Sequence, residues 1–550
     1  MAVTGKTVIV LGGGVGGLSA AHELVERGFR VRVFERKARF GGKARSMEVP
    51  NTGTAGRLAL PGEHGYRFFP NFYKHVTDTM KRIPYEGNAT GVYDNIVSGT
   101  RTQIARNGKM SVFEVSRYPV TLDDWVAKLK AMVDNADLGI PQDEILFWVD
   151  RLLTLLTTCE ERRVKEYDKI PWWDFVDAAN KSTAYQQYLV RGSTRSLVAL
   201  KPEEGSTRTV GYVGLQLGLG LLKVGEAVDR LLNGPTNEVW IDPWMSYLQS
   251  KGVELQDNAL VVGFKMNGLE ISSVAIEMDG AVQEINGDYY VSALPVEVIA
   301  PLLTDEMKRA APSIANIDKL RTSWMNGIQF YLEHDVPVVN GHTIYIDSPW
   351  ALTSISQRQF WQSERMEKYG DGRLGGILSV DISDWTTPGI LYGRTAVQCT
   401  AEEIKNEVWA QIKGHLNVDG AQQLEDANLL TWFLDPDIEF PNPSQVTNLE
   451  PLLINTAGSL AYRPEAFTEI PNFFLASDYV HTYTDLATME GANEAARRAT
   501  NAILDREGST AARAMVWPLE EPEFFAPMRE YDRLRFRLGL PHAGLALPLH

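Results

Sequence analysis

Residues 7–35 read TVIVLGGGVGGLSAAHELVERGFRVRVFE, and the spacing of the apolar residues divides this stretch into four parts. Thr7 to Leu11 is a short, β-branched apolar run of the kind that forms a buried parallel strand. Apolar residues then recur at helical spacing from Val15 to Val25, and Gly28 stands where a helix would stop. Arg30 to Glu35 alternates like a second strand. The stretch therefore predicts strand, glycine turn, helix and strand, the opening unit of a Rossmann-type α/β fold.

The glycine turn fits the pattern G-x-G-x-x-G through Gly12, Gly14 and Gly17. Gly12 allows the tight turn, Gly14 lets a pyrophosphate approach the backbone, and Gly17 lets the helix pack on the strand. The phosphates would meet free N–H groups at the positive end of the helix dipole. Glu35, at the end of the second strand, can accept hydrogen bonds from both hydroxyls of an adenosine ribose. The unit predicts a dinucleotide site whose candidate contacts are Gly12, Gly14, Val15, Gly16, Gly17 and Glu35.

A second pair of glycines follows within residues 39–45, which read RFGGKAR. Two glycines flanked by cations suit a loop that lies over the same pyrophosphate, because the loop supplies N–H donors and neutralises charge. The candidate contacts here are Arg36, Gly41, Gly42, Lys43 and Arg45.

These two strings carry a family resemblance. Residues 8–24 and 33–46 resemble the FAD-binding signature of the flavin amine oxidase and carotenoid desaturase superfamily. Residues 62–71, GEHGYRFFPN, are similar to the glycine–histidine–aromatic segment of phytoene desaturases, the branch that this chain resembles most. Because that segment touches the flavin in the family, the resemblance implies that FAD is the cofactor. It also implies cofactor contacts by His64, Gly65 and Tyr66.

A third stretch near the C-terminus resembles the closing motif of the same family. Residues 472–479, NFFLASDY, are similar to its last strand, although Ser477 stands where the family usually has glycine. Residues 486–492, LATMEGA, resemble the opening of the helix that follows. The N–H groups of such a helix point to the side of the flavin where negative charge gathers on reduction. The resemblance implies cofactor contacts by Asp478, Thr488, Met489 and, from the middle of the chain, Val261.

Motifs at both chain ends imply a discontinuous cofactor domain. The fold class expected is α/β, with a Rossmann-type FAD-binding domain (GR2-like) interleaved with an α+β substrate domain. The FAD-binding parts are expected at residues 1–115, 235–320 and 440–510. The substrate domain is expected at residues 116–234, mainly helical, and 321–439, with a tail at 511–550.

Composition excludes several classes of function. The chain has 550 residues and a net charge of −16, which argues against a nucleic-acid partner. Its two cysteines exclude a disulfide framework, and no run of about 18 apolar residues occurs, so we expect a cytoplasmic protein. No metal-site spacing and no CxxC motif occur, so we expect no metal. The tail, basic and then apolar, either packs on the body or on a partner subunit, as in a homo-oligomer, or lies on a membrane surface.

Polar residues near the flavin segments are the candidates for substrate chemistry. His64 has three open interpretations: a proton shuttle or substrate contact, a FAD contact, or a structural histidine. Glu63 and Arg67 either form an ion pair or bind polar groups of the substrate. The candidate catalytic residues are thus His64, Glu63 and Arg67. The candidate substrate contacts beside the closing motif are Arg463, His481 and Ala487.

Three functions remain open. The first is a desaturase-like oxidoreductase that removes a hydride from a C–H bond of an apolar, polyene or isoprenoid substrate, the flavin being reoxidised by O2 or a quinone. The second is an amine or amino-acid oxidase that uses O2. The third is an isomerase, cyclase or dehydroxylase that uses FAD without net oxidation. The fold alone does not decide among them.

Overall fold

A five-stranded parallel sheet is built from three separate parts of the chain. In the order β23–β13–β1–β2–β9, every neighbouring pair runs parallel. The strands are β1 (Thr7–Leu11), β2 (Arg30–Phe34), β9 (Glu254–Gln256), β13 (Tyr289–Ser292) and β23 (Phe473–Leu475). Helix α1 (Val15–Val25) joins β1 to β2, as the opening stretch predicts. The Rossmann-type sheet is therefore confirmed, with the C-terminal strand at its edge.

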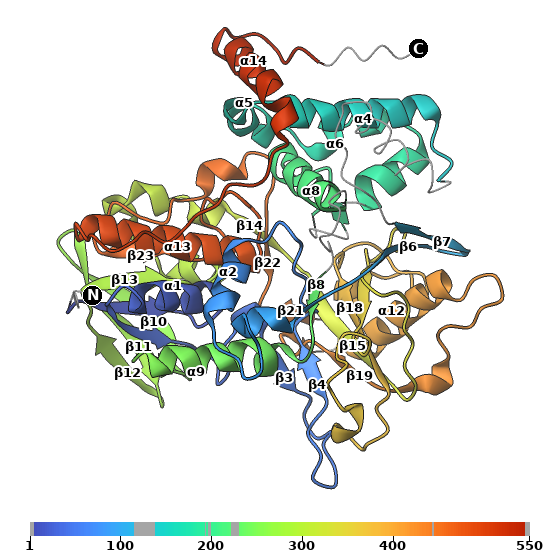
Figure 1. Cartoon of the computed structure of the whole chain (residues 1–550), viewed down its shortest axis with the longest axis horizontal. Helices are drawn as coiled ribbons and strands as arrows, with labels where there is room; N and C mark the ends of the chain where they lie inside the picture. Colours follow the sequence, from blue (N-terminus) through green and yellow to red (C-terminus); the bar gives the residue numbers. More distant parts are fainter. Residues whose placement is uncertain are drawn as a thin grey trace.

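The computed structural model describes residues 5–114, 138–192, 194–195, 200–221, 230–442 and 445–544. In Figure 1, α1 and α13 lie over the parallel sheet, and a second sheet and a helical layer flank it. Residues 116–137 of the substrate domain that we expect to be mainly helical fall outside the described residues.

Helix α1 packs on the sheet through glycine backbone. A Cβ built on Gly17 would lie 1.8 Å from the carbonyl oxygen of Gly12. A Cβ on Gly16 would lie 2.0 Å from the carbonyl oxygen of Ala476, just beyond β23. Real Cβ atoms do not approach oxygen so closely, so only glycine fits these two positions. Helix α1 also packs against α13 (Met489–Arg506), which ties the first unit of the fold to the last.

A three-stranded antiparallel sheet extends the cofactor domain. Its strands are β10 (Leu260–Asn267), β11 (Glu270–Met278) and β12 (Ala281–Ile285). The turn between β11 and β12 has positive φ at Asp279 (51°) and Gly280 (74°), the two central positions of a type I′ hairpin turn. Asp-Gly between two apolar runs is a sequence pattern that favours this turn, so the β11–β12 hairpin follows from local turn chemistry.

A seven-stranded mixed sheet forms the core of the second unit, in the order β19–β15–β18–β17–β16–β6–β7. Its strands are β6 (Thr102–Arg106), β7 (Lys109–Glu114), β15 (Asn326–Leu332), β16 (Thr343–Tyr345), β17 (Thr353–Ser356), β18 (Gly376–Ile382) and β19 (Leu429–Leu434). Helix α12 (Ala401–Leu416) packs on it. We expected residues 1–115 to lie wholly in the cofactor domain. Instead β6 pairs in parallel with β16, so residues 102–114 belong to the second sheet.

Shorter elements connect these sheets. The strands are β3 (Ser46–Glu48), β4 (Pro61–Glu63), β5 (Ile96–Ser98), β8 (Arg230–Leu232), β14 (Arg321–Ser323), β20 (Ile438–Asn442), β21 (Gln445–Asn448) and β22 (Leu452–Ile454). The α-helices are α2 (His75–Arg82), α9 (Asp242–Ser250), α10 (Val296–Leu302) and α11 (Asp305–Ala310).

A helical layer caps the molecule at the top of Figure 1, and the C-terminal tail packs on it. It contains α4 (Gln142–Thr157), α5 (Glu160–Lys165), α6 (Trp172–Phe175), α8 (Thr207–Leu221) and α14 (Ala526–Arg537). Phe525, just before α14, is fully buried in the core of this layer. Asp532 of α14 accepts hydrogen bonds from the Cys159 N–H (2.9 Å) and from Arg162 (3.0 Å). The described tail is therefore packed on the body. No helix in the described part of the chain is long and apolar enough to cross a membrane.

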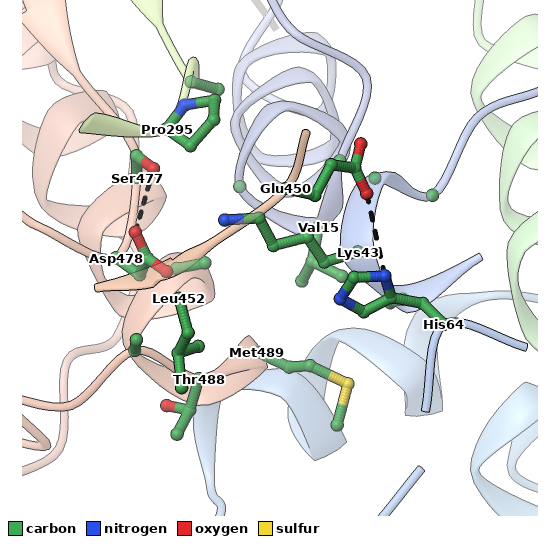
Figure 2. A pocket seen from close by; sticks show the side chains of 18 of the residues that line it. Val15, Lys43, His64, Pro295, Glu450, Leu452, Ser477, Asp478, Thr488 and Met489 are labelled. Carbon is green, nitrogen blue, oxygen red and sulfur yellow. Dashed lines mark hydrogen bonds and ion pairs between the residues drawn. The ribbon is translucent and has the colours of Figure 1, made fainter. Parts of the chain in front are cut away.

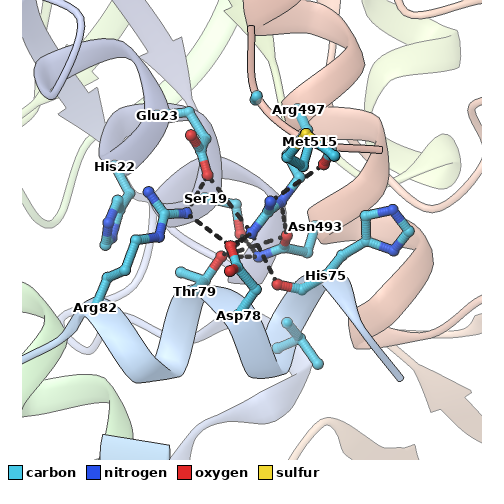
Figure 3. Close-up of polar contacts among 12 residues, drawn as sticks. Ser19, His22, Glu23, His75, Asp78, Thr79, Arg82, Asn493, Arg497 and Met515 are labelled. Atoms are coloured by element: carbon cyan, nitrogen blue, oxygen red, sulfur yellow. Dashed lines mark hydrogen bonds and ion pairs between the residues drawn. The ribbon is translucent and has the colours of Figure 1, made fainter. Parts of the chain in front are cut away.

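A buried polar network joins α1, α2 and α13 behind the sheet (Figure 3). Arg497 of α13 is 1% exposed and donates to the Asn493 side chain (2.8 Å) and to the His75 carbonyl (2.9 Å). It also pairs with Asp78 of α2 (2.7 Å) and lies 3.6 Å from Glu23 of α1. One guanidinium thus holds three helices that come from opposite ends of the chain.

We expect Arg497→Met to lower the free energy of unfolding by about 3–5 kcal/mol, because it strands buried acceptors without a donor. Denaturant unfolding of the purified protein measures the change. Arg506→Met, at an exposed position of the same helix, is the control and should cost less than about 0.5 kcal/mol. Equal effects of the two substitutions would contradict the role given to the network.

Candidate functional site

A cavity of about 360 Å³ opens between the two sheets (Figure 2). Gly12, Ala293 and Ala476, which follow β1, β13 and β23, line one wall. Ligands of parallel α/β sheets bind at this carboxyl edge. Asp381 of β18 and Met325, just before β15, line the opposite wall, so each domain contributes one side.

Two glycine loops meet at the start of α1. The N–H of Gly41 donates to the carbonyl of Gly13 (2.9 Å). A Cβ on Gly42 would lie 2.9 Å from the Cα of Gly14. The two loops therefore approach each other backbone to backbone, at a distance that a side chain on Gly42 would prevent. Gly14 is the N-cap of α1, its cap has no side-chain hydrogen bond, and the first turn carries no acidic residue. The free N–H groups at this cradle fit a pyrophosphate, as the sequence predicts.

Glu35 lies at the end of β2 with its carboxylate turned back to the glycine turn. Its two oxygens accept hydrogen bonds from the N–H groups of Gly13 (2.7 Å) and Lys37 (2.9 Å). Each oxygen keeps a lone pair, and Glu35 lines the cavity. Val261 of β10 lines the same end, where the adenine is expected. The pair fits an adenosine.

Cations expected at the pyrophosphate divide into two groups. Lys43 and Arg36 line the cavity, although Lys43 lies 3.1 Å from Glu297 and Arg36 lies 3.1 Å from Glu450. Arg45 does not line it, contrary to our expectation, because its buried guanidinium is bound to Glu450 (2.9 Å) and Asp437. Burial raises the pKa of Glu450, but the charge of Arg45 outweighs this and holds that pKa well below its usual range.

The closing motif reaches the cavity from the other end of the chain. Asp478 lines it and accepts a hydrogen bond from the Ser477 hydroxyl (3.3 Å), a contact that the usual glycine would not make. Thr488 is the N-cap of α13, and its hydroxyl accepts the Gly491 N–H (3.0 Å). Thr488 and Met489 both line the cavity, so α13 begins there, at the residue predicted.

Several candidates lie elsewhere. Glu63 does not line the cavity, because the N–H and hydroxyl of Thr236 bind its carboxylate (3.0 and 2.9 Å). Arg463 does not line it either, since its guanidinium binds backbone carbonyls of residues 478–480 at 2.7–3.0 Å. His481 is turned to Glu465 (3.0 Å) on the surface. Gly17 does not line the cavity either, because in α1 it faces the carbonyl of Gly12, where its role is packing. Of the candidate substrate contacts, Ala487 lines the cavity.

The flavin-proximal segment, residues 64–67, lines the cavity along its whole length. His64 Nδ1 lies 2.6 Å from Asp435. The Tyr66 hydroxyl is hydrogen-bonded to His342 and to Thr353 (2.7 Å). Arg67 donates to the carbonyls of Gly65 and Lys43 and lies 4.0 Å from Glu63, so the expected ion pair is long.

Among the described residues, His64, Asp437 and Glu450 place potential metal ligands within 4.8 Å of one another. Lys37 lies 2.7 Å from Asp437 and 2.8 Å from Glu450, and Arg45 is bound to both carboxylates. These cations already balance the negative charge, so the cluster is an ion-pair network.

Our sequence predictions missed many of the residues that line the cavity beyond the cofactor loops. The additional lining residues are Phe68, Pro70, Phe72, Tyr73, Val213, Leu217, Met325, His342, Asp381, Leu452 and Leu486. Most are apolar and lie on strands or helices that resemble ordinary core elements in sequence. Only the aromatic run after Arg67 belongs to a segment, residues 62–71, that the sequence marked as close to the cofactor.

The fold and the cavity define an α/β protein that binds a dinucleotide between two domains. Residues 15–504 match the family model of flavin-containing amine oxidoreductases, so the chain belongs to this family and is an FAD-dependent oxidoreductase. The 15-cis-phytoene desaturase of Synechococcus elongatus is 24% identical over 523 residues, covering 93% of this chain and 98% of the desaturase. Hydroxysqualene dehydroxylase of Zymomonas mobilis is 23% identical over 312 residues, covering 54% of this chain and 64% of that protein. A solved structure of putrescine oxidase has a TM-score of 0.60 at 13% identity, covering 91% and 99%, and shows a shared fold.

We expect Glu35→Ala to weaken FAD binding at least about tenfold, because a charged acceptor of ribose hydroxyls is lost. The ratio of flavin to protein after dialysis, and titration of the apoprotein with FAD, measure the change. Glu254→Ala, an exposed acid on the neighbouring strand β9, is the control. If both variants keep FAD equally well, the ribose role of Glu35 is wrong.

Proposed function

We propose that this protein is a desaturase-like oxidoreductase that removes a hydride from a C–H bond of a polyene or isoprenoid substrate. The observation that carries the proposal is the apolar wall opposite the glycine loops. Phe68, Phe72, Val213, Leu217 and Leu486 line the cavity on this side. Such a surface binds a hydrocarbon chain by removing its apolar area from water.

Bound FAD would supply the two-electron acceptor. The residues of this chain bind and orient it: the two glycine loops and Lys43 for the pyrophosphate, Glu35 for the ribose, and the start of α13 for the flavin. The apolar wall excludes water from the reacting C–H bond. The later electron acceptor, O2 or a quinone, belongs to the same proposal.

An amino-acid oxidase would require a free arginine to bind the substrate carboxylate. Arg463 lies outside the cavity and is held by backbone carbonyls. Arg67 lines the cavity, but it donates hydrogen bonds to the carbonyls of Gly65 and Lys43. Neither arginine is directed to a substrate carboxylate, which favours the apolar substrate.

Anaerobic mixing of the holoprotein with single substrates tests the proposal. We expect phytoene or ζ-carotene, supplied in detergent micelles, to bleach the flavin and to yield a product with one more carbon–carbon double bond and a longer conjugated system. Putrescine tests for amine oxidation, and hydroxysqualene tests for dehydroxylation. Bleaching by putrescine alone, or conversion of a substrate without bleaching, would contradict the desaturase proposal.

A polyene substrate is stored in a bilayer, so the proposal includes contact with a membrane surface. Leu534 (56% exposed) and Leu538 (65% exposed) lie at the end of α14 beside Arg535 and Arg537, a pattern typical of interfacial helices. We expect Leu534→Gln with Leu538→Gln to reduce co-sedimentation with anionic vesicles. Leu269→Gln, 68% exposed in the β10–β11 turn, is the control. Unchanged sedimentation of the double variant would remove this part of the proposal.

A further inference from the structure

A buried carboxyl group lies on the substrate side of the cavity. Asp381 of β18 is 7% exposed and lines the cavity. Its Oδ1 is buried and has no hydrogen-bond partner among the described residues. A buried acceptor without a donor is costly for folding, so such a group calls for an explanation.

The backbone beside this carboxyl has a glycine where a side chain would collide with the Asp381 oxygen. A Cβ built on Gly65 would lie 2.8 Å from Asp381 Oδ1, so the glycine leaves the space that the oxygen occupies. Gly65 belongs to the segment that we expect to touch the flavin. The carboxyl therefore lies against that segment, within the cavity that both domains form.

Other carboxylates that line the cavity are already engaged. Glu35 accepts two backbone N–H groups, Glu450 is bound to Arg45, and Asp478 accepts the Ser477 hydroxyl. In the described part of the cavity wall, Asp381 alone combines a buried carboxyl with an oxygen that has no partner. It is the group best placed to exchange a proton with a bound molecule.

The charges facing Asp381 come from the end of β4 and the segment that follows it. Burial raises its pKa to about 7, while Arg67, His64 and the Tyr66 N–H lower it and Glu63 raises it. Across the sheet its neighbours are Gly327 and Thr353, which do not ionise, and Thr353 accepts the Tyr66 hydroxyl, itself bonded to His342. A carboxyl of this pKa suits a general base at neutral pH, since it is partly ionised and holds a proton well.

We propose that Asp381 accepts the proton that a substrate loses when its carbon–carbon double bond forms, an inference that rests on the proposed function. Desaturation removes a hydride from one carbon and a proton from its neighbour. Bound, oxidised FAD would accept the hydride with its electron pair. The proton passes to Oδ1 of Asp381, and the electron pair of that C–H bond becomes the second bond of the alkene. Asp381 then returns the proton to water before the next turnover.

Asp381→Asn in the FAD-loaded protein tests this role, because it keeps the shape and removes the base. We expect unchanged FAD content and a loss of about 100-fold or more in the rate at which phytoene bleaches the flavin. In the wild type, that rate should rise with pH through about 7, where Asp381 ionises, and level off above it. The variant should lack this rise. Asp335→Asn is the control. The Asp335 carboxyl is exposed, lies in space beside Gly376 at the start of β18 and does not line the cavity, so this variant should behave as the wild type.

A measurement without substrate accompanies the kinetics. Infrared difference spectra of the holoprotein should show a protonated carboxyl band that titrates near pH 7, is absent from Asp381→Asn and is retained in Asp335→Asn. A wild type without this band, or a variant that is bleached as fast as the wild type, overturns the assignment and leaves the proposed function intact. If no polyene bleaches the wild type, the proposed function fails and takes the Asp381 role with it.

Discussion

The structure depends on backbone-to-backbone contact at the start of α1. Gly17 meets the Gly12 carbonyl and Gly16 meets the Ala476 carbonyl, both at distances that exclude any Cβ. The first contact sets α1 on its own strand. The second fixes α1 against Ala476, just beyond β23 and 460 residues away from Gly16 along the chain. A single added methyl group would push the two ends of the chain apart, so the cofactor cradle exists only while both contacts hold.

Placing the chain ends together has an electrostatic consequence. Because α1, α2 and α13 come together, the buried Glu23 and Arg497 share one network with the partly exposed Asp78, and their charges must balance there. A similar balance appears beside the cavity, where Lys37 and Arg45 neutralise Asp437 and Glu450. Buried ion pairs of this kind add specificity of arrangement more than stability, which suits a domain assembled from distant segments.

The division of the cavity between two domains explains how the family can change substrate while keeping its cofactor. Loops at the carboxyl edge of the parallel sheet offer N–H groups and the Glu35 carboxylate, which fit phosphates and a ribose. The opposite wall includes Val213 and Leu217 of α8, Met325 just before β15, His342 just before β16 and Asp381 of β18, and of these only Asp381 and His342 are polar. Its side chains can vary without touching the glycine cradle, since the two walls belong to separate sheets.

The sequence by itself determined the local units: β1–α1–β2 with its glycine turn, the β11–β12 hairpin, and an α13 that begins at Met489. The first two follow from period and turn chemistry over a few residues, and they predict the Rossmann-type sheet and a dinucleotide site. FAD and the start of α13 are implied by the family resemblance of the motifs. Only the tertiary structure decided that β6 and β7 join the second sheet and that Glu63, Arg45 and Arg463 turn away from the cavity. It also decided that Asp381 faces into it. Pairing partners, side-chain direction and burial depend on residues far away in the chain, and no local pattern records them.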